Sequence, residues 1–256
     1  MKKLFALAAF LTVGIGAWAQ NLTQYVDPYI GTGGHGHVFL GANVPYGLVQ
    51  VGPTQYKRGW DWCSGYHYSD SVIIGFGQMH LSGTGIGDLG DIALLPTTDA
   101  TQHDVMFSHK GEHARPGYYS VMLKSGVKVD LTATARVAFH RYTYPADAQT
   151  AFVRLDLSQG IGWDKMTKSA FKQNSPTEVS GYRYSTGWAK DQRVYFVAQF
   201  SRPVTMAKSQ GDSLAVLSTP NNDEPLLVKV GISPVSEDNA RANIAAELPA
   251  WDFRGT

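Results

Sequence analysis

The segment 60–68 gathers aromatic, acidic and hydrogen-bonding side chains, and it reads WDWCSGYHY. Aromatic rings stack on the axial C–H groups of a pyranose, while carboxylates and amides bind its hydroxyl groups. This mixture favours a sugar-binding site, with Trp60, Asp61, Trp62 and Cys63 as candidate ligand-binding residues. The alternative is structural: in a strand, Trp60 and Trp62 would share one face and Asp61 would occupy the other. One face would then serve the core and the other a ligand.

Two glycine-rich loops match the dinucleotide-binding pattern G-x-G-x-x-G. They are GTGGHG at 31–36 and GIGDLG at 85–90. That pattern binds a pyrophosphate only where it lies between a strand and a helix. Here each loop leads into an apolar run that meets a proline, at Pro45 and Pro96 respectively. We therefore exclude nucleotide binding and expect the glycines to let the backbone pass close to another group.

Four histidines offer imidazoles that a metal ion could bind. His35 and His37 flank a glycine, and His67 and His80 follow along the chain. Residues two apart share a face only in an extended strand, so a rigid ligand pair at His35 and His37 is disfavoured. We expect loop-anchoring roles and assign no metal ligand. A metal hydrolase built on the four histidines is the weakest interpretation.

No pair of catalytic acids stands out. Asp88 and Asp91 lie among glycines, where aspartates commonly hold turns by accepting backbone hydrogen bonds. All five glutamates lie outside the aromatic and glycine-rich segment 25–96, at Glu112, Glu178, Glu224, Glu237 and Glu247. A glycosidase needs a protonated carboxylic acid opposite a second carboxylate. Because no such pair and no G-x-S-x-G motif is present, we predict no catalytic residue in this chain.

The elements that must position these residues are mostly strands. From Val129 to Phe139 every second residue is apolar, which predicts one long strand with a single buried face and with His140 facing away. A turn at Ser125 would join it to a strand over 119–123 as a hairpin. Further strands are predicted at 152–157, 194–200, 214–217 and 226–232. A late helix begins at the N-cap Ser236, and its apolar positions recur at helical spacing. The fold class is therefore an all-β antiparallel β-sandwich of two sheets with one C-terminal helix.

Composition and charge narrow the function further. The chain has 256 residues, of which 43% are hydrophobic and 17% charged, as in a globular protein. Residues 1–19 combine Lys2 and Lys3 with a short apolar stretch and a small-x-small cleavage site, which predicts a secretory signal peptide and export. Removing those two lysines leaves 20 basic against 21 acidic residues, a net charge of −1, so a nucleic-acid partner is excluded. The apolar stretch is too short to span a membrane, so we predict no transmembrane segment.

Several long motifs resemble a known family. The runs at 27–37, 60–70 and 80–92 are similar, in this order, to signatures of glycoside hydrolase family 92, the bacterial exo-α-mannosidases. The stretches at 115–119, 139–142, 187–192 and 228–233 agree as well. The resemblance covers nearly all of the chain after the predicted signal peptide.

The resemblance implies a two-part, calcium-dependent, inverting enzyme that acts on mannose-containing glycans. A β-sandwich would pack against an (α/α)₆ barrel that supplies the glutamate acid, the aspartate base and most calcium ligands. The chain stops where the family crosses from sandwich to barrel. We therefore expect residues 20–235 to be the sandwich, residues 236–256 to begin the connection, and the missing catalytic domain to be the partner.

The resemblance also implies which residues of the sandwich reach the mannose pocket. Carried over to this sequence, the candidates for substrate binding are Gly33, Gly34, His35, Trp60, Asp61, Trp62 and Cys63. Possible supporting residues are His67, His80, Asp88 and Asp91. The protein would be periplasmic or secreted.

A free-standing carbohydrate-binding sandwich without catalysis is the alternative function. It would use the same aromatic residues and glycine loops. A docking half should expose a large apolar patch beside the terminal helix, whereas a finished binding module should not.

Overall fold

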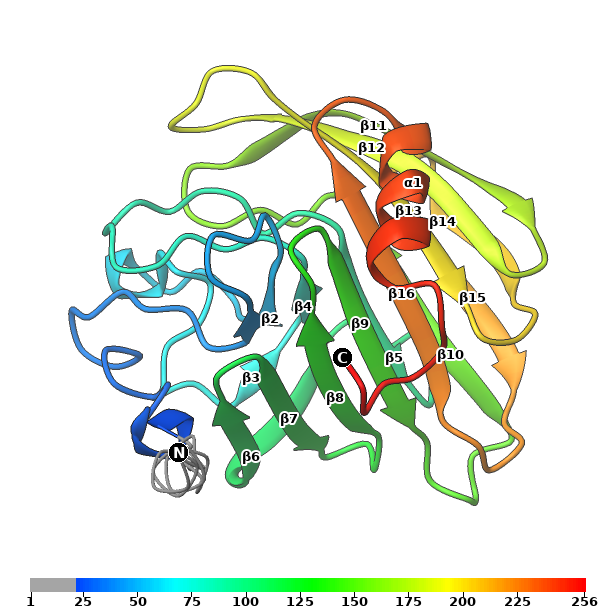
Figure 1. The fold of residues 1–256 in the computed structure, drawn as a ribbon, viewed down its shortest axis with the longest axis horizontal. Coiled ribbons are helices and arrows are strands. Elements are labelled where there is room, and N and C mark those ends of the chain that lie inside the picture. Colours follow the sequence, from blue (N-terminus) through cyan, green and yellow to red (C-terminus); the bar gives the residue numbers. More distant parts are fainter. Residues whose placement is uncertain (1–21) are drawn as a thin grey trace, which may run out of the picture.

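The computed structural model describes residues 22–256, so the predicted signal peptide lies outside the described residues. The chain forms two antiparallel sheets stacked on one another, with one helix outside them (Figure 1). In the order of hydrogen-bonded neighbours, the first sheet contains β11 (Lys165–Ser175), β12 (Glu178–Thr186), β13 (Gln192–Phe200), β16 (Leu226–Ser233), β9 (Val137–Thr143), β8 (Lys128–Ala133), β7 (Tyr118–Leu123), β6 (Val105–Arg115) and β3 (Val72–Ile73). The second contains β1 (Ala42–Asn43), β2 (Gln50–Thr54), β4 (Gly75–Gly77), β5 (Ala93–Thr97), β10 (Thr150–Asp156), β15 (Leu214–Pro220) and β14 (Thr205–Gln210). The predicted fold class is confirmed.

The hairpin β7–β8 shows how period-2 sequence builds the core. Tyr119, Val121 and Leu123 point between the sheets and are buried, because alternate side chains of a strand face the same side. Gly126 closes the turn at φ +86°, a left-handed conformation that glycine adopts at low cost. The predicted hairpin is therefore present. The strands predicted at 152–157, 194–200, 214–217 and 226–232 correspond to β10, β13, β15 and β16.

The prediction of one long strand from Val129 to Phe139 is wrong. The chain reverses between Ala133 and Ala138, which pair across the β8–β9 hairpin. Odd-numbered residues face inward before this reversal, and even-numbered residues face inward after it. His140, expected to face away, lies between the sheets, while Phe139 faces outward under the helix. Both faces of β9 are therefore buried.

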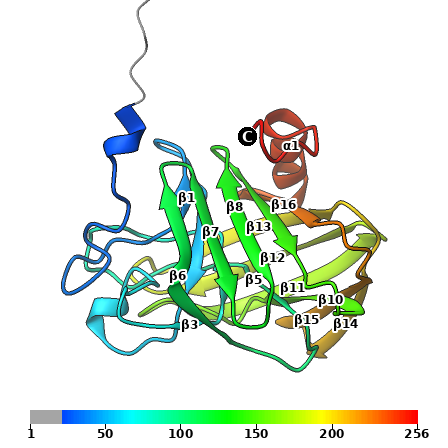
Figure 2. The same cartoon turned by 90° about the horizontal axis from the view of Figure 1, so that it is seen from below.

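The helix α1 (Glu237–Glu247) covers the outer face of the larger sheet (Figure 2). Ser236 is its N-cap, as predicted, and the Ser236 Oγ accepts a hydrogen bond from the Asn239 amide. The helix buries Ala240 and Ile244 against Val137, Phe139 and Val197. This second small core explains why β9 carries apolar residues on both faces.

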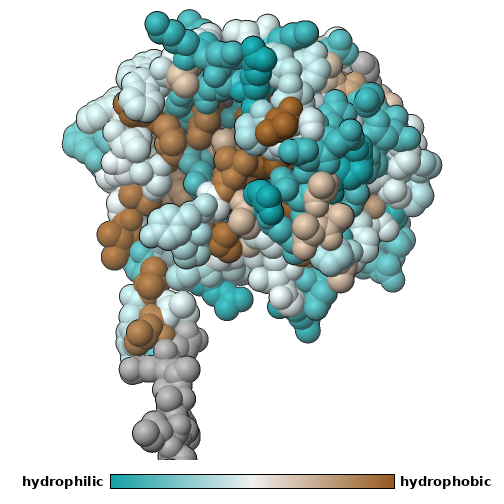
Figure 3. All heavy atoms as spheres, turned by 45° about the horizontal axis from the view of Figure 1, so that its top comes forward, coloured by the Kyte–Doolittle hydropathy of each residue, from teal (hydrophilic) through white to brown (hydrophobic). Residues whose placement is uncertain are grey.

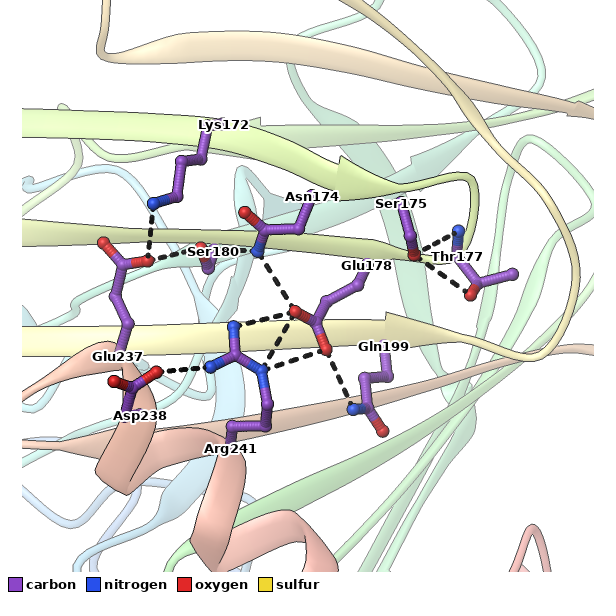
Figure 4. A network of polar contacts seen from close by, with 10 residues as sticks. All are labelled: Lys172, Asn174, Ser175, Thr177, Glu178, Ser180, Gln199, Glu237, Asp238 and Arg241. Atoms are coloured by element: carbon purple, nitrogen blue, oxygen red, sulfur yellow. Dashed lines mark hydrogen bonds and ion pairs between the residues drawn. The ribbon is translucent and has the colours of Figure 1, made fainter.

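A polar network fixes the same helix to β11, β12 and β13 (Figure 4). The Arg241 guanidinium donates hydrogen bonds to Glu178 on β12, with Nη2 at 2.9 Å from Oε1, and to Asp238 one turn earlier. Glu237 accepts a hydrogen bond from Ser180 on the same strand and pairs with Lys172 at 3.6 Å. The helix is therefore part of the sandwich.

The strands β1 to β5 are short, and the chain between them forms the long loops that appear blue and cyan in Figure 1. These loops are joined by backbone hydrogen bonds between distant segments. Tyr68 N donates to Thr32 O, Gly83 N to His37 O, and Trp163 N to Gly87 O. The hydrogen bonds bring the loops around residues 35, 60, 85 and 160 together.

Candidate functional site

The motif at 60–62 is a 3-10 helix, η2 (Trp60–Trp62), and not a strand. Its two tryptophans therefore do not share a face. Trp62 is half-buried: its indole donates to Asp70 at 3.2 Å, and its ring stacks on His67 at 4.3 Å. The Trp60 side chain is 60% exposed, and its Nε1 donates to Gly85 O at 2.8 Å. Trp60 is therefore the more exposed of the two tryptophans, whereas Trp62 is held by its contacts with Asp70 and His67.

Asp61, in the middle of this 3-10 helix, is the centre of a polar group. His35 Nδ1 donates to Asp61 Oδ1 at 2.6 Å, and His37 Nε2 donates to the same oxygen at 3.2 Å. The hydrogen bond from His35 is the largest of several effects that lower the pKa of Asp61, so the carboxyl is ionised at neutral pH. The rings of His37 and His35 pack against Trp60, with centroids 4.2 and 5.9 Å away.

From the sequence we did not expect His35 and His37 to point toward the same group. The structure shows that both imidazoles contact Asp61, so this expectation was wrong. The loop folds back at Gly36, whose amide donates to Gly33 O. A Cβ on Gly36 would lie 2.2 Å from Gly31 O, so glycine permits the fold. Asp61 then accepts from both imidazoles. Gly34, at φ +57° with open space around it, leaves His35 exposed at the rim.

The same group is the cluster that could hold a metal ion within residues 22–256. The ligand atoms of His35, His37 and Asp61 lie within 4.8 Å of one another. Two imidazoles and one carboxylate are a donor set suited to zinc and unsuited to calcium, which takes six to eight oxygens. Because the imidazoles already donate to the carboxylate, the group is satisfied as a hydrogen-bonded unit. Neither His67 nor His80 belongs to it.

The remaining predicted histidines support the loops. His67 Nδ1 bonds Ser69 Oγ at 2.8 Å. His80 is buried, with Nδ1 2.7 Å from Gln50 O and Nε2 3.1 Å from Thr54 Oγ1. Burial lowers the pKa of His80 to about 4. Both histidines therefore act as anchors.

Asp88 and Asp91 are buried scaffold residues. Both carboxylate oxygens of Asp88 accept from Gln192 Nε2 at 3.0 Å. Asp91 accepts from Arg183 Nη1 at 2.6 Å, and the same guanidinium bonds Asp164. Burial alone would lower the pKa of Arg183, but its two carboxylate partners raise it overall. These aspartates hold the loops around residues 87 and 162 and do not form an acid–base pair.

A cleft beside the polar group was missed by sequence reasoning. It has a volume of about 220 Å³ and lies between Trp60 and Trp163. The remainder of its lining consists of Lys57, Gly59, Cys63, Gly87 and Gly162. Cys63 is buried, which raises the pKa of its thiol. The signal in the sequence for Trp163 is an aromatic residue directly after the glycine-rich stretch 160–162.

The surface beside the helix exposes few large apolar side chains. Val235 and Trp251 are exposed there, and the Lys229 ammonium lies over the Trp251 ring at 4.1 Å. More apolar residues are exposed in the N-terminal segment, at Leu22, Tyr25, Val26 and Ile30. Figure 3 shows brown apolar residues rising from the grey trace and others scattered among hydrophilic ones. The large apolar patch expected of a docking half is therefore not seen beside the helix in the part of the chain that the structure describes.

Comparisons with known proteins agree on one family. Residues 25–233 match the model of the glycosyl hydrolase family 92 N-terminal domain. The fold superimposes with a TM-score of 0.81 on a family GH92 alpha-mannosidase from Bacteroides thetaiotaomicron, at 31% identity over 91% of this chain. The mannoimidazole complex of that enzyme gives a TM-score of 0.78 at 31% identity over 87% of this chain.

Two further relatives are more distant. A family GH92 inverting mannosidase from Bacteroides thetaiotaomicron shares the fold, with a TM-score of 0.72 at 24% identity over 90% of this chain. An "Uncharacterized secreted glycosidase" of Arthroderma benhamiae is 24% identical over 96% of this chain. The chain spans only 34–38% of the length of these relatives. In residues 22–256 no helix is long and apolar enough to cross a membrane.

Proposed function

Because this chain belongs to glycosyl hydrolase family 92, we propose that it is the substrate-binding N-terminal part of an exported exo-α-mannosidase acting on mannose-containing glycans. The single observation that carries the proposal is the group formed by the exposed His35, the half-buried Asp61 and the buried His37, which packs against the exposed Trp60. The ionised carboxylate and the exposed His35 imidazole offer hydrogen bonds to vicinal hydroxyl groups, and the indole of Trp60 offers a face to sugar C–H groups. Export is supported by the basic and apolar start of the sequence and by the secreted fungal relative.

The role of this chain in the reaction is binding and orientation. Asp61 has a lowered pKa, so it accepts hydrogen bonds from sugar hydroxyls and is a poor proton donor at neutral pH. An inverting glycosidase needs two carboxyl groups roughly 6.5–9.5 Å apart with a water molecule between them. We infer that both groups come from the part of the enzyme beyond this chain.

Calcium is expected to bind elsewhere in the enzyme. The donor set at Asp61 contains two nitrogens and one carboxylate, which does not fit the oxygen-rich shell that calcium requires. No step at His35, His37 or Asp61 therefore depends on it. The family's calcium dependence would arise from ligands in the second part of the protein.

The experiment compares the full-length gene product with residues 20–256 alone, using mannose release from α-linked mannobiose. The full-length protein should release mannose with inversion, which proton NMR of the first-formed anomer detects, and a chelator should abolish the release. Residues 20–256 should release none. Mannose release by residues 20–256 alone would refute the division of labour. A full-length protein that binds mannose but never releases it would favour the non-catalytic binding sandwich.

A further inference from the structure

His35, His37 and Asp61 form a donor set of the kind that transition metals bind. Their ligand atoms all lie within 4.8 Å of one another in the part of the chain that the structure describes. Three protein ligands, with a fourth position left for water, are the usual arrangement of an open zinc site, and imidazole nitrogens and carboxylate oxygens are zinc ligands. The chemistry of this group therefore extends beyond hydrogen bonds to a sugar.

Only small movements separate the observed geometry from that of a zinc site. Zinc in a tetrahedral site lies about 2.0–2.1 Å from each nitrogen, which places neighbouring ligand atoms about 3.3 Å apart. His37 Nε2 is already 3.2 Å from Asp61 Oδ1, whereas His35 Nδ1 is closer to that oxygen, at 2.6 Å. The His35 side chain can move outward because it is 77% exposed and follows Gly34, which has open space around it.

A metal ion would replace the two N–H groups that now meet at Asp61. In the structure both imidazoles donate to the same carboxylate oxygen. A neutral imidazole carries its proton on either ring nitrogen, so each ring can hold the proton on its other nitrogen and offer a lone pair to the metal. Water can accept from that other nitrogen of His35, because the side chain is exposed. The group therefore binds a cation without losing or gaining a proton.

Trp60 restricts the orientation of both imidazoles. Its ring lies 4.2 Å from that of His37 and 5.9 Å from that of His35, measured between centroids. The indole is itself held, since its Nε1 donates to Gly85 O at 2.8 Å. Ligands whose orientation is fixed before binding lose less conformational entropy when the metal binds, which favours affinity.

We propose that His35, His37 and Asp61 form a zinc-binding site, and that zinc bound there prevents mannose from binding. The second part rests on the proposed function, which assigns Asp61 and His35 to the terminal mannose. Zinc takes the lone pairs of both groups, so neither can accept a hydrogen bond from a sugar hydroxyl. Zinc is therefore an inhibitor that competes with the sugar.

The test measures zinc binding by isothermal titration calorimetry with the full-length gene product, which carries no histidine tag. Calcium is present throughout, because it occupies oxygen-rich sites and leaves a site with two nitrogens free. The wild-type protein should bind one zinc ion at this group. His35→Gln and His37→Gln should each weaken zinc binding by at least about 10-fold. Saturating mannose should weaken zinc binding to the wild-type protein to a similar extent.

His103→Gln is the matched control. His103 is also exposed beside a carboxylate, with its Nε2 3.8 Å from Asp104 Oδ2, but in the described residues this pair belongs to no cluster of three metal ligands. The zinc affinity of this variant should equal that of the wild type.

A wild-type protein that binds no zinc, or a zinc affinity that both variants retain, would overturn the inference and leave the proposed function intact. A zinc affinity that mannose leaves unchanged, in a protein that does bind mannose, would overturn both, because the mannose would then lie elsewhere. Melting temperatures identify any loss caused by misfolding of His37→Gln, since His37 is buried. The variant His35→Gln, at an exposed position, then decides.

Discussion

Gly162 and Gly87 cross so closely that a Cβ built on Gly162 would lie 2.3 Å from the Gly87 Cα. The backbone of Gly162 is also in the left-handed region, at φ +62°. This crossing brings the loop that carries Trp163 against the loop that follows His80, and both line the cleft beside Trp60. The geometry of the cleft thus depends on two residues that have no side chain.

Gly162→Ala should therefore destabilise the protein by more than the cost of placing alanine in a left-handed backbone conformation. Gly34→Ala is the control, because Gly34 has a similar φ of +57° but open space around it. The left-handed conformation costs about 1–2 kcal/mol for alanine in both variants. In Gly162→Ala a backbone clash adds to this cost. Urea unfolding should show a clearly larger loss for Gly162→Ala, and equal losses would contradict the close crossing.

Arg183→Met tests the buried ion network. Arg183 is fully buried and pairs with Asp91 and Asp164, so its removal leaves two buried carboxylates without their cation. Breaking a buried pair in this way costs about 3–5 kcal/mol.

Arg193→Met provides the comparison, because Arg193 forms an exposed pair with Asp191. An exposed ion pair of this kind contributes little to stability, because water and salt screen it. Chemical denaturation of both variants gives the two free energies of unfolding. Similar values would show that the network around Arg183 does not hold the loops.

Stability should fall in mild acid because of two buried histidines. Burial lowers the pKa of His80 to about 4 and that of His140 to about 3, against an ordinary value of 6.5. Below about pH 6.5 these histidines are therefore protonated in the unfolded chain while they stay neutral in the folded chain. The contribution of the neutral histidines to the free energy of unfolding is fully present above pH 6.5. It is lost as the pH falls toward the pKa values of the folded protein. Each histidine should cost roughly 2 kcal/mol between pH 6.5 and pH 5.

The hydrogen bonds of His140 agree with the neutral form. Its Nε2 donates to Gln78 Oε1 at 3.0 Å, so Nδ1 is free to accept from the Tyr142 hydroxyl at 2.8 Å. His140→Gln should remove about half of the slope of unfolding free energy against pH. An unchanged slope in His140→Gln would show that His140 titrates normally in the folded protein.

The fold could be predicted from sequence where alternation reflects a single buried face. It succeeded for the hairpin of Tyr119 and Val121 and failed at the reversal between Ala133 and Ala138. A tight turn keeps apolar residues alternating along the chain while it changes which residues face inward. The outward face of β9 is also apolar because α1 covers it. Alternation along one segment cannot report either event, since both depend on tertiary packing.

The sequence predicted which residues belong to the candidate site but not how they are arranged in space. Trp60, Asp61 and His35 were identified from chemistry and from the family motifs, and the structure brings them together. The 3-10 helix at residues 60–62 places Trp60 and Trp62 in different surroundings. A segment of three residues is too short to show a helical periodicity in the sequence, so this helix could not be predicted. Trp163 was missed because it lies far along the chain, and only the contact with Gly87 places it beside Trp60.

The most direct test of the central claim, that this chain binds the terminal mannose for chemistry performed elsewhere, is the kcat/KM of Asp61→Asn in the full-length gene product on α-linked mannobiose. Loss of a hydrogen bond to a charged group should lower kcat/KM by at least about 10-fold. Asp104→Asn, at a partly exposed carboxylate bonded to Tyr56, should match the wild type. An Asp61→Asn enzyme that releases mannose at the wild-type rate would contradict the claim.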